Sequence, residues 1–205
     1  MPCSLPTFTR TTLPAFLIYG SQVGIQRYYG NRQNPFRIIG PTGTISFMQN
    51  LERAYGDDIR IRLADEKNPI EGVKIAPSEY TQDGVVYETN GVKVTAFEVN
   101  HGDLIKPAYG YRIDYDGRSV IISGDTRYSE NLEKYAQGAT LVIHEVAIAN
   151  QEYYDKTPVI KYIMGHHIRP RRRVRCSRGS SLNLRLTLIL SFWARQPIRP
   201  QRSRT

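Results

Sequence analysis

The stretch Arg118-Ser-Val-Ile-Ile-Ser-Gly-Asp-Thr126 is the part of the sequence that best indicates both the fold and a functional site. Its apolar run predicts a buried strand, and the glycine and Asp125 that follow predict a small polar loop at the exit of that strand. All four histidines of the chain lie on either side of this stretch, and none occurs in the first hundred residues; they are His101, His144, His166 and His167. A carboxylate on a rigid strand end, among histidines from other loops, is typical of a divalent-metal site.

The sequence around this stretch predicts strands flanked by helices, which is a layered α/β architecture. Hydrophobic periodicity and Asn-Gly or Asp-Gly turns locate these elements. They are helices over 45–55 and 130–137, hairpins of 85–89 with 92–99 and of 109–115 with 118–123, and a buried strand over 140–144. Thr44 is the expected N-cap of the first helix, because its hydroxyl suits that position.

Composition predicts one domain with a sizeable core, because 40% of the 205 residues are hydrophobic. No apolar run is long enough to span a membrane and no secretory signal opens the chain, so a cytoplasmic protein is favoured. The net charge of +9 comes from the last part of the chain, and residues 1–167 have a slight excess of acidic groups. Residues 168–205 hold eleven arginines and no acid, whereas the other residues carry 17 basic and 19 acidic groups.

The order of the polar strand ends resembles the latter half of the metallo-β-lactamase fold, specifically its ribonuclease Z-like phosphodiesterase branch. The resemblance covers roughly residues 13–167. The motifs that carry it are Gly40-Pro-Thr-Gly-Thr44, Val99-Asn-His-Gly102, Pro107-Ala-Tyr-Gly-Tyr-Arg112, Gly124-Asp-Thr126, Ile143-His-Glu145 and Gly165-His-His167.

This resemblance implies a four-layer αββα sandwich, here truncated, with two zinc ions at one edge of the sheets. His101 matches a ligand of the first metal, and Asp125 matches the carboxylate that bridges both. His167, or else His166, matches a loop histidine that assists phosphate binding or protonates the leaving group. His144 and Glu145 match a supporting pair, although His144 also fits a satisfied buried histidine. The implied partners are an RNA such as a tRNA precursor, cut near its 3′ end, or a small ester, and family members are often homodimers.

The chain departs from the family at both ends. The motif His-x-His-x-Asp-His, which supplies four ligands before the Gly-Pro-Thr-Gly-Thr region, has no counterpart here, and no later histidine follows His167. Two residues that would contact the metal directly, His101 and Asp125, are too few for a zinc site, which needs about three protein ligands per metal. We therefore expect weak or absent zinc binding and little hydrolysis by this chain, although the family is enzymatic.

Both ends become interpretable in a shifted reading frame. Starting at the third base of each codon, residues 6–12 permit His-Leu-His-Ser-Asp-His, and the residues after His167 permit Thr-Ser-Pro-Glu-Ala-Gly. The codons of Leu188 and Ile189 permit a late histidine. We expect residues 1–12 to be an out-of-frame N-terminus, 13–167 an incomplete domain, and 168–205 an out-of-frame, disordered tail. DNA codons that are incompatible with these words would exclude the idea.

Two other functions stay open. The same fold also suits hydrolysis of another ester, a sulfate ester or a lactone. Alternatively, the chain is a non-enzymatic basic protein that binds nucleic acid or a membrane surface through its tail. In that case residues 169–178 would contact phosphates and residues 182–193 would form an amphipathic segment.

Overall fold

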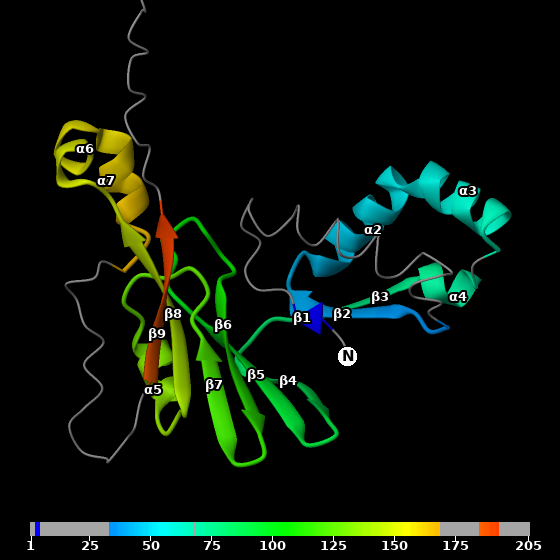
Figure 1. The fold of residues 1–205 in the computed structure, drawn as a ribbon, viewed down its shortest axis with the longest axis horizontal. Helices are drawn as coiled ribbons and strands as arrows, with labels where there is room; N and C mark the ends of the chain where they lie inside the picture. The colour runs from blue at the N-terminus through cyan, green and yellow to red at the C-terminus, as the bar shows by residue number, and fades with distance from the viewer. Residues whose placement is uncertain (1–2, 5–32, 68, 169–184, 193–205) are drawn as a thin grey trace, which may run out of the picture.

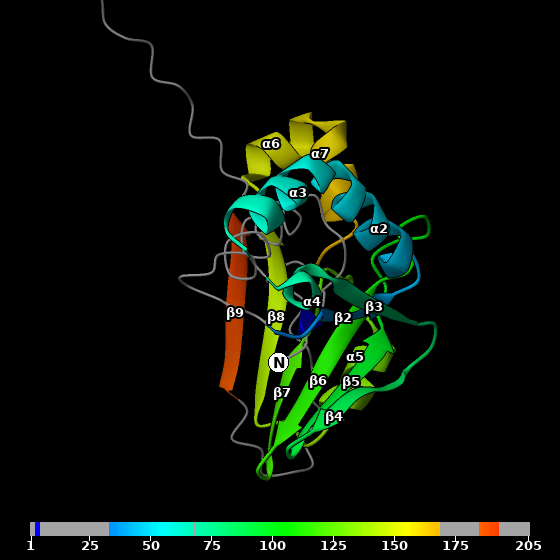
Figure 2. The ribbon, with the colours of Figure 1, turned by 90° about the vertical axis from the view of Figure 1, so that its right-hand side faces the viewer.

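The computed structural model describes residues 3–4, 33–67, 69–168 and 185–192, which form two β-sheets with helices on their outer faces (Figure 1). The smaller sheet is parallel throughout, with the order β1 (Cys3–Ser4), β2 (Phe36–Pro41) and β3 (Ile75–Tyr80). Figure 2 shows α2 to α4 over this sheet, the larger sheet behind it, and α5 beyond the larger sheet. The helix–sheet–sheet–helix order expected from the sequence is therefore confirmed.

Among the described residues the larger sheet has six strands in sequence order, and tight turns join its first strand to its second and its third to its fourth. At both turns the two central residues have positive φ, 52° and 79° at Asn90-Gly91 and 48° and 68° at Asp116-Gly117. This backbone favours Asn or Asp followed by Gly and matches the twist of the strands, so both predicted hairpins form. The strands are β4 (Gly84–Thr89), β5 (Val92–Glu98), β6 (Tyr109–Tyr115), β7 (Arg118–Ile122), β8 (Leu141–Ile148) and β9 (Arg185–Phe192).

The two predicted helices are present, and the described part of the chain contains four more. The predicted pair is α2 (Thr44–Ala54) and α5 (Glu130–Ala136); the others are α3 (Gly56–Asp65), α4 (Ile70–Val73), α6 (Gln151–Lys156) and α7 (Pro158–Met164). Ser129 caps α5, because its hydroxyl accepts a hydrogen bond from the Leu132 amide. Beyond its C-terminus, Gly138 adopts a φ of 68°. In the described part of the chain no helix has the length and apolarity needed to cross a membrane.

The N-cap predicted at Thr44 is wrong by one residue. Gly43 occupies the cap position with φ 99°, and the Thr44 hydroxyl instead donates back to the Pro41 carbonyl at 2.6 Å. The free amides at the start of α2 are satisfied by Glu79 of β3, whose Oε1 accepts from Gly43 N and Ile45 N at 2.9 and 2.8 Å. The cap therefore comes from a residue distant in sequence, which local patterns do not reveal.

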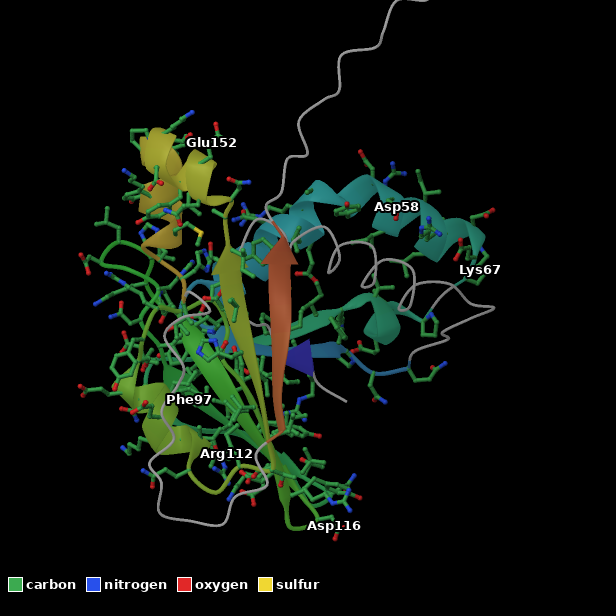
Figure 3. The ribbon with its side chains drawn as sticks, turned by 60° about the vertical axis from the view of Figure 1, so that its left-hand side comes forward. Asp58, Lys67, Phe97, Arg112, Asp116 and Glu152 are labelled. Carbon is green, nitrogen blue, oxygen red and sulfur yellow. The ribbon has the colours of Figure 1, made fainter. Side chains whose placement is uncertain are left out.

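The main core lies between the larger sheet and α5. Phe97 of β5, labelled in Figure 3, stacks on Tyr135 of α5 with ring centroids 4.7 Å apart. Both Phe97 and Ile121 are fully buried, and each such side chain contributes about 1.5–3 kcal/mol of hydrophobic stabilisation. This packing fixes the strands β5 and β7, whose C-terminal ends carry the histidine and the carboxylate singled out in the sequence.

One part of the tail differs from expectation. Residues 185–192, expected to be disordered, form β9 and pair in parallel with β8. Their period-two alternation of apolar residues, with Leu186, Leu188 and Leu190 at alternate positions, is the pattern of a strand. The other tail residues, 169–184 and 193–205, and the segment 6–12 that carries the shifted motif lie outside the described residues.

A pair of tyrosines, one buried and one partly buried, joins the two sheets. Because of this pair, the free energy of unfolding is expected to fall at alkaline pH. The Tyr80 and Tyr111 hydroxyls lie 2.7 Å apart. Burial raises the pKa of Tyr80, and it raises the pKa of Tyr111 to about 12. In the unfolded chain both phenols ionise near pH 10. The folded state therefore keeps protons that the unfolded state loses above pH 10, so stability is full below pH 10 and falls between about pH 10 and 12.

We expect the free energy of unfolding to drop more steeply above pH 10 in this protein than in the Tyr80→Phe/Tyr111→Phe variant. One unit of pKa difference corresponds to about 1.4 kcal/mol, so the loss for Tyr111 reaches a few kcal/mol near pH 12. Urea unfolding from pH 8 to 11.5 measures it. Tyr115→Phe, at an exposed position, is the control. Parallel pH profiles for the double variant and the unchanged chain would contradict the expectation.

Candidate functional site

The loop after β7 brings Asp125 beside the end of β5. Gly124 adopts φ 64°, which turns the chain sharply after Ser123. The buried Thr126 hydroxyl ties the two loops together, accepting from Asn100 N at 3.1 Å and lying 3.2 Å from the Asn100 carbonyl. Asp125 and the residue after Asn100, which is His101, are thereby held at one edge of the larger sheet.

His101 and Asp125 lie side by side. His101 is buried, and its Nε2 is 4.0 Å from Asp125 Oδ2. Its other nitrogen, Nδ1, lies 3.2 Å from the His166 carbonyl, which orients the ring. Burial and the nearby Glu145 carboxylate raise the pKa of Asp125, while His101 and His167 act against this shift. A carboxylate that loses solvation here gains from a cation bound next to it.

Glu145 of β8 connects His167 to the Asp125 loop. Its Oε1 lies 3.1 Å from His167 Nδ1 and accepts from the Thr126 and Ile168 amides at 3.3 and 3.4 Å. This carboxylate raises the pKa of His167 in spite of burial. His167 therefore stays protonated to higher pH than an isolated histidine, and its ring centroid lies 5.2 Å from that of His101.

His166 packs at the rim of the same cluster. Its ring lies edge-on to Tyr162 of α7, with centroids 4.6 Å apart, and edge-on to His101 at 5.9 Å. Burial, followed by His101 and Arg127, lowers the pKa of His166. The two neighbouring histidines are thus pushed in opposite directions, so that His167 is the better proton donor and His166 the better neutral hydrogen-bonding group near pH 7.

Glycine is required at position 102 because the His166 ring packs directly against its backbone. It has φ 119°, and a β-carbon on it would lie 2.5 Å from His166 Cδ2. We expect Gly102→Ala to displace the His166 ring and to destabilise the fold by about 2–4 kcal/mol, from overpacking and backbone strain together. Urea unfolding and the NMR signals of the His166 ring measure both effects.

The matched control is Gly117→Ala, which has φ 68° and open space around it. It carries the backbone cost alone, about 1–2 kcal/mol. An equal loss of stability in the two variants, with the His166 signals unmoved, would show that the close approach is unimportant.

His144 is separated from the cluster by strand geometry. Neighbouring residues of a strand point to opposite faces, so His144 turns away from the face on which Glu145 meets His167. It is buried, and its Nδ1 lies 2.6 Å from the Glu145 carbonyl. The sequence analysis matched His144 and Glu145 together to a supporting pair. In the structure only the Glu145 side chain reaches the other site residues.

Arg127 is a site neighbour that the sequence reading missed. It directly follows Gly124-Asp-Thr126, and its guanidinium reaches Asp103 and the region of Gly102 and His166. A basic residue two positions after the Asp125 carboxylate was the available signal. Neither of its contacts is local in sequence, so the pattern alone did not reveal them.

The residues present do not complete a two-zinc site. In the described ranges no group of three or more His, Cys, Asp and Glu residues is arranged to hold an ion. The sequence adds that the residues outside those ranges include no His, Asp or Glu. His101 and Asp125 are two donors where zinc takes about three protein ligands or more. The described residues thus fit a partial metal site.

Comparisons with known proteins agree with this fold. The family described as Beta-lactamase superfamily domain matches residues 32–178. Ribonuclease Z of Mycobacterium marinum is 33% identical over 112 residues, covering 55% of this chain and 39% of that protein. A putative ribonuclease Z of Mycobacterium tuberculosis is 34% identical over 112 residues, covering 55% and 49%. The chain therefore spans less than half the length of these relatives.

Among solved structures, the short form of human tRNase Z superposes with a TM-score of 0.55 at 17% identity, covering 82% of this chain and 64% of that one. This likeness supports the fold alone. The family match, by contrast, spans most of the chain, including every histidine discussed above. The chain therefore belongs to the beta-lactamase superfamily, has the metallo-β-lactamase fold, and is similar in sequence to ribonuclease Z over about half of its length.

Proposed function

We propose that this chain descends from a metal-dependent phosphodiesterase of the ribonuclease Z type, acting on RNA such as a tRNA precursor, and keeps part of its site. The observation that carries the proposal is the convergence of His101, Asp125, Glu145 and His167 from separate loops and strands. Relatives named ribonuclease Z support the substrate class. No described feature favours an ester, sulfate-ester or lactone substrate over a phosphodiester.

His101 and Asp125 are the residues that would hold a metal, which in this family is generally zinc. A bound zinc would supply an activated water, because it lowers the pKa of that water to about 7. With two protein donors, much of the binding free energy of a complete site is missing. We therefore propose that this chain holds zinc weakly and hydrolyses little.

His167 is proposed as the proton donor to the leaving oxygen. Its Nδ1 lies against Glu145 at 3.1 Å, which leaves Nε2 as the nitrogen available to a substrate. The Glu145 carboxylate is in turn fixed by two backbone amides, from Thr126 and Ile168. A buried carboxylate that orients a protonated imidazole is a suitable arrangement for general acid catalysis.

The proposal that the ends are out of frame gains support from the strand register. In the parallel pair β8–β9, Leu188 lies opposite His144 and Ile189 opposite Glu145. The shifted late histidine arises from the codons of these same two residues. Its backbone position is therefore adjacent to the strand that carries Glu145, where a ligand for the site would belong.

Activity toward phosphodiesters and esters tests the proposal. We expect the purified chain with zinc to hydrolyse thymidine 5′-p-nitrophenyl phosphate slowly, and faster than p-nitrophenyl acetate or sulfate relative to the uncatalysed rates. In cleavage of the dinucleotide ApA, whose leaving alkoxide oxygen needs a proton, His167→Asn should lower kcat by on the order of 10²-fold, the usual effect of losing a general acid, and His166→Asn by much less. A preference for the acetate or the sulfate, or a larger loss in His166→Asn, would contradict it.

A further inference from the structure

Arg127 is rigidly connected to the loop that carries His101. Its amide donates to the Asn100 carbonyl at 2.8 Å. The hydroxyl of the preceding Thr126 accepts from the Asn100 amide at 3.1 Å. Asn100 itself caps the turn that follows, because its side-chain oxygen accepts from the Gly102 amide at 3.2 Å. The backbone of Arg127 therefore has a fixed position relative to the proposed metal ligands on both loops.

The Arg127 side chain has an exchangeable partner. Its Nη2 donates to Asp103 Oδ1 at 3.1 Å, but the Asp103 side chain is 96% exposed. Ion pairs in such exposed surroundings contribute little net stability, because water competes for both charges. Arg127 Nε, in contrast, is buried and has no hydrogen-bond partner among the described residues. One edge of this guanidinium lacks an acceptor, and the other is weakly held.

The guanidinium borders the candidate site at Gly102. A β-carbon built on Gly102 would lie 3.0 Å from His166 Nε2 and 3.7 Å from Arg127 Nη2, so both groups pass over the same α-carbon. Arg127 is also close enough to be one of the charges that lower the pKa of His166. A group bound beside His166 is thus within reach of Arg127.

The charges of the site create a need for such a cation. Asp125 and Glu145 are carboxylates, and both repel a phosphodiester that approaches His167. A guanidinium offsets this repulsion, and its planar fork of donors matches two oxygens of one phosphate. Asp103 is also anionic, and it holds one donor of this fork, Nη2, when no phosphate is bound.

We propose that Arg127 binds a phosphate of the phosphodiester substrate and exchanges Asp103 for it. This inference rests on the proposed function, because it names the residue that recognises the substrate of that site. Arg127 acts in it as a substrate-binding and positioning residue, and the Asp103 carboxylate acts as a competitor for the fork.

Binding of the dinucleotide ApA, which contains one phosphodiester, tests the exchange in EDTA, where zinc plays no part. NMR titration follows the His166 ring signals and the Arg127 Nε–H signal in the full chain. We expect Arg127→Ala to weaken binding about tenfold, a loss typical of one charge-assisted contact, and Asp103→Asn to tighten it about threefold. Arg127→Lys should recover only part of the affinity, since it lacks the fork.

The matched control is Arg60→Ala in α3, which removes the same charge and breaks a similar exposed ion pair, to Asp57 at 3.1 Å. Because the arginine-rich tail is present in every variant, its contribution cancels in the comparison. Adenosine, which has no phosphate, should show no difference between variants. Equal affinities of Arg127→Ala and Arg60→Ala for ApA, or unmoved His166 signals in the unchanged chain, would overturn the inference.

Zinc-dependent cleavage is measured separately on the same variants. If ApA binding depends on Arg127 while the chain cleaves no phosphodiester with zinc, the proposed function fails and the binding role of Arg127 stands. If cleavage occurs and Arg127→Ala leaves both KM and the NMR titration unchanged, the inference fails and the proposed function stands.

Discussion

A chain whose two ends are restored to the shifted frame is expected to hold two zinc ions and to cleave phosphodiesters at least about 10³-fold faster than the chain as written. The restored segment at residues 6–12 adds the three histidines and the aspartate of His-Leu-His-Ser-Asp-His. The restored tail adds a histidine at the position of Leu188 and Ile189, beside the strand that carries Glu145. His101 and Asp125 are already 4.0 Å apart, so the added ligands complete an existing arrangement.

A control variant has to distinguish the effect of the added metal ligands from the effect of the restored ends on folding. A restored chain in which the added histidines and aspartate are replaced by alanine has the same ends without the donors. We expect it to fold as the restored chain does and to bind zinc as weakly as the chain as written. Metal analysis, circular dichroism and diester hydrolysis compare the three proteins. If the fully restored chain binds no more zinc than its alanine counterpart, the out-of-frame interpretation is wrong.

Asp125→Asn is expected to remove the residual zinc affinity, weakening it by about 100-fold or more. The substitution keeps the size of the side chain and removes the anionic donor, and metal sites lose 10–100-fold even when only an outer partner is changed. Calorimetric zinc titration measures the affinity. Asp116→Asn is the control, because Asp116 lies at the hairpin turn at the far end of the larger sheet (Figure 3). Equal affinities of the two variants would contradict a ligand role for Asp125.

Asp125→Asn should also change the free energy of unfolding of the metal-free protein. Burial raises the pKa of Asp125, which means that the fold disfavours its charged form at neutral pH. Asp125→Asn should therefore be as stable as the unchanged chain in EDTA, or more stable, and this gain should disappear as the pH falls and Asp125 becomes protonated. A residue kept for stability alone would show the opposite result, a loss at pH 7.

Local sequence signals predicted the elements whose chemistry is local. The hairpins follow from Asn90-Gly91 and Asp116-Gly117, which adopt the positive φ values that such pairs favour. The helix α3 was missed because Gly56-Asp-Asp has the composition of a helix end. Within this helix Arg62 pairs with Asp58 and Glu66 at i,i+4 spacing, and each such pair supports a helix by about 0.2–0.5 kcal/mol.

The sequence predicted most of the residues of the candidate site, but it did not predict which of them contact one another. The sequence placed His101 and Asp125 at neighbouring strand ends, and the fold brings them together. The contact of Glu145 with His167 depends on how the chain after α7 returns to β8, which no spacing encodes. The same is true of Arg127, whose position beside His166 depends on the absence of a side chain at Gly102.

Equilibrium dialysis of the purified chain against zinc, with metal analysis, tests most directly whether an incomplete metal site surrounds His101 and Asp125. We expect at most one ion per chain, held weakly, lost in both His101→Ala and Asp125→Asn and kept in Asp116→Asn. Two tightly held ions per chain, or binding that is indifferent to His101 and Asp125, would contradict it.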